Sequence, residues 1–180
     1  QLMAKYGSLV NFSGHIHAQS IVKNEVDTVS LFDITTESLV VAENNYGVVT
    51  ISDSNLVYEA KSLDVDGWAK KQGITDENLL NFHQYAWQHY YDMSYNLFLG
   101  NYDNLEVNQK VKEDIASLFA YLNPYYFSGR MDEVASQITE HPGYVALQKN
   151  SDVFSTNYLE SMLAERDCLQ RKIEITDIRK

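Results

Sequence analysis

The chain has 180 residues, in which 25 acidic side chains face 14 basic ones, and its formal net charge is −11. This length suits one medium domain or two small ones, and the acidic balance argues against a protein that binds a nucleic acid duplex. No segment approaches the ~20 consecutive apolar residues of a membrane span. The single cysteine, Cys168, excludes an intrachain disulfide and a cysteine-based zinc site but leaves the cellular compartment open.

The chain begins with a short helical pattern. Leu2, Met3 and Tyr6 share one helical face, and Gly7 is typical of a helix C-cap. The pattern starts inside a helix, with neither an initiator Met nor a signal peptide before it. The sequence is therefore expected to be a fragment of a longer protein.

Extended segments follow up to about residue 64. Runs rich in β-branched and aromatic residues alternate with polar turn clusters at a spacing of about 8–12 residues, which predicts a meander of antiparallel hairpins. The acidic residues Glu25, Asp27, Asp33 and Glu37 are expected to lie on exposed strand faces. The expected extended segments are residues 9–12, 21–22, 29–34, 38–41, 46–51 and 56–63.

From residue 66 the hydrophobic period becomes helical. Thr75-Asp76-Glu77 is predicted to cap a helix that ends at Gly100, and Asn104 to cap a second helix that stops before Pro124. A shorter helix over residues 131–138, a fourth over 159–169 and a terminal strand over 173–175 complete the prediction. The apolar face of the first helix is expected to consist of Leu79, Phe82, Ala86, Tyr90, Met93 and Leu97.

Many tyrosines lie in this helical part. The interpretation that we favour is that they build the core of a small bundle, because tyrosine buries a ring and keeps a polar tip. The alternative is a surface that caps a catalytic cleft or contacts a partner. His83 and His89 are expected to be half-buried helix residues, and His141 a loop residue.

The segment that follows the first expected strand carries a pattern typical of a site. On an extended chain, residues two apart project to the same side, so His15 and His17 are predicted to converge while Ile16 faces the core. Gly14 would let the backbone approach a metal ion or a phosphate, and neutral imidazole is a good ligand for zinc, iron or manganese. Alternatively, both histidines are surface or packing residues, since two ligands are too few for a catalytic centre.

The same residues carry a resemblance to a known family. Lys5-Tyr6-Gly7 followed by Phe12-Ser13-Gly14-His15-Ile16-His17-Ala18-Gln19 resembles the last metal-binding motif of the calcineurin-like metallophosphoesterases, Gly-His-x-His after a strand. Residues 32–40 and 45–49 resemble the end of the same catalytic domain, a four-layered αββα sandwich. The helical part is similar to the C-terminal extension of bacterial cyclic-nucleotide-phosphodiesterase-like members.

The resemblance implies an α+β fold with two parts. Residues 1–65 would be the C-terminal segment of a metallophosphoesterase catalytic domain, and residues 66–180 a small α-helical C-terminal domain. Half of a sheet would leave an edge strand and an apolar face exposed near Leu9, Val10 and Phe12. We expect such a fragment to cover this surface by self-association, by rearrangement or by disorder.

The resemblance also implies a reaction. In the parent enzyme His15 would ligate one ion of a dinuclear centre of manganese, iron or zinc and His17 the other, with Gly14 next to the substrate. Such a centre hydrolyses a phosphodiester small molecule, with cyclic nucleotides as candidates. In this fragment the centre is expected to be incomplete or empty. The family's Asp-x-His and Gly-Asn-His motifs do not occur in this sequence, so the chain alone is expected to be inactive. The alternative function is a non-catalytic helical interaction module with a β-segment.

Overall fold

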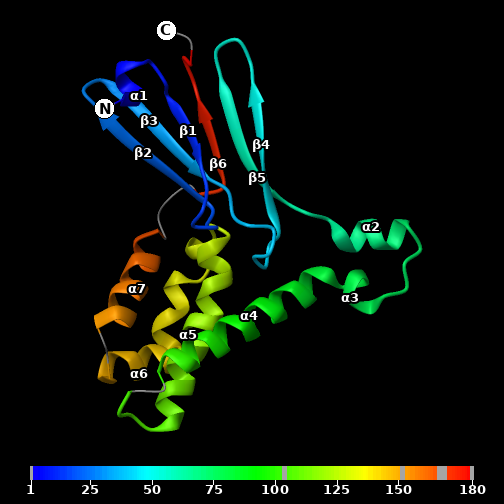
Figure 1. Cartoon of the computed structure of the whole chain (residues 1–180), viewed down its shortest axis with the longest axis vertical. Helices are drawn as coiled ribbons and strands as arrows, with labels where there is room; N and C mark the ends of the chain where they lie inside the picture. The colour runs from blue at the N-terminus through cyan, green and yellow to red at the C-terminus, as the bar shows by residue number, and fades with distance from the viewer. Residues whose placement is uncertain (1, 103–104, 151–152, 166–169, 179–180) are drawn as a thin grey trace. The chain divides into compact units, whose positions relative to one another are not determined.

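The computed structural model (Figure 1) describes residues 2–102, 105–150, 153–165 and 170–178. The fold is mixed α+β, which confirms the predicted fold class. The chain forms two compact units: the first comprises residues 1–63, 127–129 and 168–180, and the second residues 64–126 and 130–167. Among the described residues, none of the helices has the length and apolar character to cross a membrane.

The first sheet of the first unit has the strand order β1-β3-β2. A short helix, α1 (Leu2–Lys5), precedes β1 (Val10–Ser13), and β2 (Ser20–Val26) and β3 (Val29–Thr35) follow. β2 and β3 form a hairpin whose two-residue turn begins at Asp27, with φ of 56°. β1 runs parallel to β3 and lies at the edge of the sheet, where the side chain of Phe12 is exposed.

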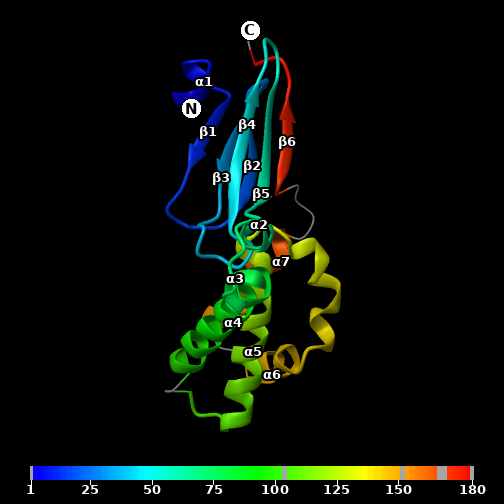
Figure 2. The ribbon, with the colours of Figure 1, turned by 90° about the vertical axis from the view of Figure 1, so that its right-hand side faces the viewer.

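The second sheet consists of β4 (Asn45–Ile51), β5 (Leu56–Ser62) and β6 (Lys172–Ile175), all antiparallel. The three strands lie side by side in Figure 2. The alternation of residues 173–175 correctly predicted β6, which pairs with β5 and so returns the end of the chain to the first unit. The core shared by the two sheets consists of Ile21, Ile34, Leu56, Tyr58, Ala60 and Ile175.

Two expectations about this unit were wrong. The strands do not form one meander, because β1 pairs with β3 in parallel and β4 starts a separate sheet. Residues 38–41 form turns rather than a strand. The backbone N–H of Val41 donates to the carbonyl oxygen of Ser38, and the amide of Asn44 donates to the carbonyl oxygen of Leu39 at 2.6 Å. Side chains such as asparagine offer the backbone these local partners in place of a sheet ladder.

The second unit begins with capped helices. Asp64 caps α2 (Val65–Lys71) by accepting from the N–H of Gly67 at 2.8 Å. Within the predicted cap, Asp76 caps α3 (Glu77–Leu80), and its carboxylate accepts from the backbone N–H groups of Asn78 and Leu79. The prediction of one continuous helix to Gly100 was wrong, because the chain breaks at Asn81 before the long helix α4 (Phe82–Asn101).

The apolar face predicted for α4 was correct at Tyr90 and wrong by one position after it. Tyr90, Ser94 and Phe98 are buried at intervals of four residues, whereas Met93 and Leu97 are 49% and 61% exposed. Residues spaced four apart line one side of a helix, and a shift of one residue gives the adjacent side. The ring of Phe98, whose centroid lies 4.6 Å from that of Phe119, determines which of the two sides faces the core.

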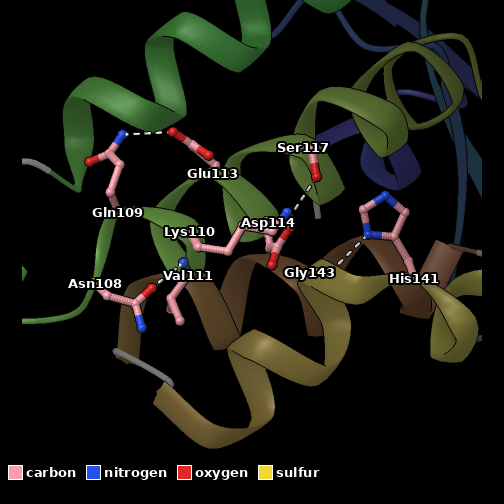
Figure 3. Close-up of polar contacts among 9 residues, drawn as sticks. All are labelled: Asn108, Gln109, Lys110, Val111, Glu113, Asp114, Ser117, His141 and Gly143. Carbon is pink, nitrogen blue, oxygen red and sulfur yellow. Dashed lines mark hydrogen bonds and ion pairs between the residues drawn. The ribbon is translucent and has the colours of Figure 1, made fainter.

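The cap of α5 (Gln109–Phe127) is Asn108, whose side-chain oxygen accepts from the N–H of Val111 at 2.9 Å (Figure 3). Asn104, the predicted cap, lies outside the described residues. The prediction that the helix stops before Pro124 was wrong, since Pro124 is buried inside the helix near its end. There a proline removes a single hydrogen bond of the last turn, which packing can offset.

Short helices complete the second unit. The predicted third helix is two 3-10 segments, η1 (Met131–Glu133) and η2 (Ala135–Glu140), and α6 (Pro142–Asn150) and α7 (Val153–Ala164) follow. The predicted end of the fourth helix near Leu169 lies outside the described residues. The main core comprises Phe98, Tyr102, Ile115, Ala116, Leu118, Phe119, Leu122, Met131, Val134, Ile138, Ala146, Leu147, Leu159 and Met162, with several further tyrosines packed against it.

Candidate functional site

The loop of residues 14–19, between β1 and β2, contains the histidines singled out in the sequence. His15 and His17 have φ of 83° and 64°, so both adopt the left-handed conformation rather than an extended one. The alternation expected along a strand therefore does not hold, and Ile16 is 68% exposed instead of facing the core. Both histidines are exposed. Non-glycine residues rarely adopt positive φ, and such strained positions cluster at functional sites.

Gln19 anchors the C-terminal end of this loop. Its side chain is 2% exposed and has a partner at each end. The amide oxygen accepts from the hydroxyl of Tyr58 at 2.8 Å, and the amide nitrogen donates to the carbonyl oxygen of Gln170 at 2.7 Å. The backbone N–H of Gln19 donates to Phe127, which belongs to the same unit, at 2.8 Å. A buried amide with these partners holds one conformation of the chain.

Tyr58 connects the loop to the segment after β3. Its hydroxyl also lies 2.9 Å from that of Thr36, and the N–H of Ser38 donates to the carbonyl oxygen of His17 at 3.2 Å. Gly47 faces the Tyr58 ring, where a side-chain carbon would lie only 2.7 Å from a ring atom. Loop 14–19 is thus held in place by three kinds of hydrogen bond: those of the Gln19 side chain, that of the Gln19 backbone N–H, and that between the His17 carbonyl oxygen and Ser38.

The edge of the first sheet carries a polar group next to the loop. The carboxylate of Asp33 accepts from the amide of Asn11 at 2.6 Å and from the hydroxyl of Ser13 at 3.0 Å. Ser13 also lies 3.1 Å from the hydroxyl of Thr35. These contacts join β1 to β3 through side chains as well as through the backbone ladder.

Glu37 contradicts the expectation of an exposed acid, because its side chain is buried. Desolvation by burial raises the pKa of Glu37 to about 7, partly offset by the N–H of Asn45, which donates to the carboxylate at 2.7 Å. Its second oxygen has no hydrogen-bond partner among the residues that the structure describes. The burial of Glu37 could not be predicted, since Thr35-Thr36-Glu37 has the composition of an ordinary polar turn.

The other predicted site residues lie as follows. Gly14 has open space where a side chain would stand, so the structure leaves its backbone accessible but does not require a glycine. His83 and His89 are exposed on α4 rather than half-buried. His141 ends η2, and its Nδ1 accepts from the N–H of Gly143 at 3.0 Å (Figure 3), while burial lowers the pKa of its imidazole. Cys168 lies outside the described residues.

The donor set suits a transition metal but is small. Two exposed imidazoles on one loop have the right chemistry for zinc, iron or manganese. Within the described residues, no group of three or more histidine, cysteine, aspartate or glutamate side chains is placed to hold a metal ion. Any complete centre therefore needs donors other than those described.

A comparison with models of protein families identifies the second unit. A family model described as the C-terminal domain of cyclic nucleotide phosphodiesterase matches residues 64–168. The match begins at Asp64, the residue that caps α2, and its range includes all of the second unit. None of the curated proteins with which the sequence was compared matches it.

Proposed function

Because the chain belongs to the family of the C-terminal domain of cyclic nucleotide phosphodiesterase, we propose that it serves a metal-dependent phosphodiesterase of the calcineurin-like class. In this proposal the first unit supplies His15 and His17 as ligands of two divalent transition metal ions, manganese, iron or zinc. The substrate is a small phosphodiester such as a cyclic nucleotide. The second unit is the helical domain by which the family is defined.

The observation that carries the proposal is the state of loop 14–19. Two imidazoles are exposed on a loop that is strained at both histidines and anchored by the buried Gln19. Positive φ at a non-glycine residue costs of order 1–3 kcal/mol, and such residues cluster at functional sites, which supports a role for this loop. Ligands held before binding lose less entropy when a metal binds.

The chain's own residues have limited and definite roles in this proposal. His15 and His17 would hold metal ions through neutral imidazole nitrogens, and the accessible backbone at Gly14 would lie next to the phosphoester. Gln19 and Tyr58 keep the loop in place. When bound, a pair of ions supplies Lewis acidity and an activated water for in-line attack on phosphorus.

Zinc titration calorimetry on matched variants tests the metal ligands. We expect His15→Ala and His17→Ala each to remove the tightest zinc-binding step of the 180-residue chain. His83→Ala is the control, because His83 is also exposed but lies on a regular helix. If all three variants bind zinc as the unsubstituted chain does, the loop is not a metal site.

The interaction-module hypothesis gives a different result in the same experiment. It expects weak and equal zinc binding by every exposed histidine, since no loop would be prepared for a ligand. The match to a phosphodiesterase domain favours the enzyme-related function.

A further inference from the structure

One side of the first unit, formed by the edge strands β1 and β4, leaves the core between the two sheets uncovered, and we call it the open side. The ring of Phe12 on β1 lies 6.3 Å from that of Tyr58 on β5, and Val49 on β4 pairs with the same tyrosine. Phe12 pairs with the buried Ile34, so both Phe12 and Val49 face the core, because paired residues of neighbouring strands project to the same face. They are nevertheless 51% and 41% exposed, and Ile51, two positions further along β4, is 65% exposed.

The opposite side of the unit, formed by β2 and β6, is closed. Ile21 on β2 and Ile175 on β6 belong to the same core and are only 9% and 4% exposed. Both strands also carry charged side chains, which on an edge strand oppose pairing with another chain. These are Lys23, Glu25, Lys172 and Glu174. β1 and β4 contain neither a charged residue nor a proline, so their edges lack this protection.

The backbone of β1 presents N–H groups to the open side. The N–H of Phe32 on β3 donates to the carbonyl oxygen of Leu9 at 2.8 Å, which sets the phase of the parallel ladder between β1 and β3. In such a ladder alternate residues of a strand turn both backbone groups toward the partner strand. Asn11 therefore faces β3, whereas the N–H groups of Val10 and Phe12 point away from β3 and can donate to another strand.

The partner that covers the open side has to cover two stacked edges. Sheets that pack face to face lie about 10 Å apart, so one extended peptide added to β1 would leave β4 uncovered. A second copy of the chain brings both edges at once. A two-fold axis perpendicular to the sheets places β1 against β1 and β4 against β4, and the strands are antiparallel in both layers.

The size and the charge of the open side fit a weak pair of identical chains. β4 has seven residues, which span about 24 Å, and two layers of about 10 Å each then give an interface of about 1,000 Å² in total. Stable complexes bury about 1,200–2,000 Å², so an affinity in the micromolar range is expected. Two chains of net charge −11 repel each other, but uncharged edges bring no like charges into contact.

We propose that two copies of this chain associate through the open side and merge their sheets. In β1 the outward-facing Val10 pairs with Phe12 of the partner subunit, Phe12 pairs with Val10 of the partner subunit, and Asn11 lies on the two-fold axis. This pairing covers Phe12, and β4 of the partner subunit covers Val49 and Ile51. Antiparallel strands send the two loops 14–19 to opposite ends of the pair, so the association does not depend on the metal site proposed above.

Sedimentation equilibrium on matched variants tests the surface. The unsubstituted chain should change from monomer to dimer between about 1 and about 300 µM, and about 300 mM salt should strengthen the dimer relative to about 50 mM by screening the charge repulsion. Phe12→Lys and Ile51→Lys each put a charge on one of the open edges and should weaken association at least about tenfold. Val22→Lys is the control and should leave association unchanged, because Val22 is also exposed but lies on β2.

Amide hydrogen exchange of the unsubstituted chain tests the strand pairing and needs no variant. Raising the concentration through the dimer transition should slow exchange at Val10 and Phe12, whereas Asn11, whose N–H faces β3, should keep its rate. A chain that stays monomeric, assemblies larger than a dimer, or association that responds alike to Phe12→Lys and Val22→Lys would overturn the proposal. So would a dimer in which the exchange rates of Val10 and Phe12 do not change.

Discussion

The two units of this chain are stabilised in different ways. The second unit is held by a large apolar core in which aromatic rings stack, as in Phe98, Phe119 and Tyr158. The first unit has a smaller apolar core, and a buried hydrogen-bonded group of Gln19, Tyr58 and Gln170 adjoins it. An apolar core loses stability when a buried side chain is made smaller. A buried polar network loses stability when the removal of one partner leaves another polar group without a hydrogen bond.

The difference also applies to the surfaces of the units. In the first unit, Phe12 on the edge strand β1 is 51% exposed, and Ile51 at the end of β4 is exposed as well. An apolar edge strand invites pairing with another chain, so self-association remains our expectation for this unit. In the second unit the surface around Trp87 and Tyr125 instead carries groups that can hydrogen-bond, His83, Gln84 and Arg130.

The largest effect is expected from the apolar core. Phe119→Ala should lower the free energy of unfolding of the second unit by about 3–5 kcal/mol, because the side chain is fully buried between Phe98 and Tyr158. Urea denaturation followed by tryptophan fluorescence measures it, since both tryptophans lie in that unit. The exposed Met93→Ala is the control and should change stability by less than about 0.5 kcal/mol. Similar losses in both variants would mean that the core is placed wrongly.

A pH-dependent effect is expected from Glu37. Its pKa is about 7 in the folded chain against 4.5 for a free side chain. Between pH 4.5 and about 7 the folded chain binds a proton at Glu37 more strongly than the unfolded chain does. The free energy of unfolding therefore falls as the pH rises through this range, and the loss is complete above the pKa of the folded chain. Glu37→Gln removes the charge and should raise the free energy of unfolding by up to about 3 kcal/mol near pH 8, with little change near pH 5.

Thermal unfolding at both pH values measures this effect. Glu25→Gln is the matched control, because Glu25 is exposed and pairs with Lys23 at 2.8 Å. Its substitution should leave the pH dependence intact. If Glu37→Gln stabilises the chain equally at both pH values, titration of Glu37 is not the cause.

A smaller effect is expected from the polar network. Tyr58→Phe removes the hydroxyl that donates to Gln19 and pairs with Thr36, and should cost about 1–3 kcal/mol because a buried amide oxygen loses its partner. Hydrogen exchange should also speed up at residues 15–17. Tyr46→Phe, whose ring is largely exposed, is the control. Unchanged exchange in loop 14–19 would show that Tyr58 does not hold the loop.

The smallest effect is expected at a helix end. Asn108→Ala should cost about 1 kcal/mol through loss of the cap on α5. Gln109→Ala, which removes only an exposed contact with Glu113, should cost a few tenths of a kcal/mol. Chemical denaturation compares the two. A larger loss for Gln109→Ala would contradict the assignment of Asn108 as the cap.

The sequence predicted elements whose causes are local. β-branched runs marked β3, β4 and β5, and Asp76 marked a helix start, because propensity and capping act over a few residues. The predictions failed for two different reasons. At residues 38–41 the local hydrogen bonds of Asn44 and Ser38 replace a strand, and on α4 the distant residue Phe119 decides which face is buried.

The candidate site also has features that could be predicted from the sequence and features that could not. The position of His15 and His17 in a loop after a strand could be predicted from their motif, but their left-handed backbone could not. The anchors of the loop come from Tyr58 and Gln170, which are far away along the chain. The pairing of Trp87 with Tyr125 in the second unit is likewise a tertiary contact that no sequence period reveals.

Paramagnetic broadening tests the central claim, that loop 14–19 is a metal site, most directly. Manganese(II) at low ratios broadens the imidazole signals of residues that bind it, and the chain has only five histidines. We predict that the signals of His15 and His17 disappear first, before those of the exposed His83 and His89. Equal broadening of all the exposed histidines would contradict the claim.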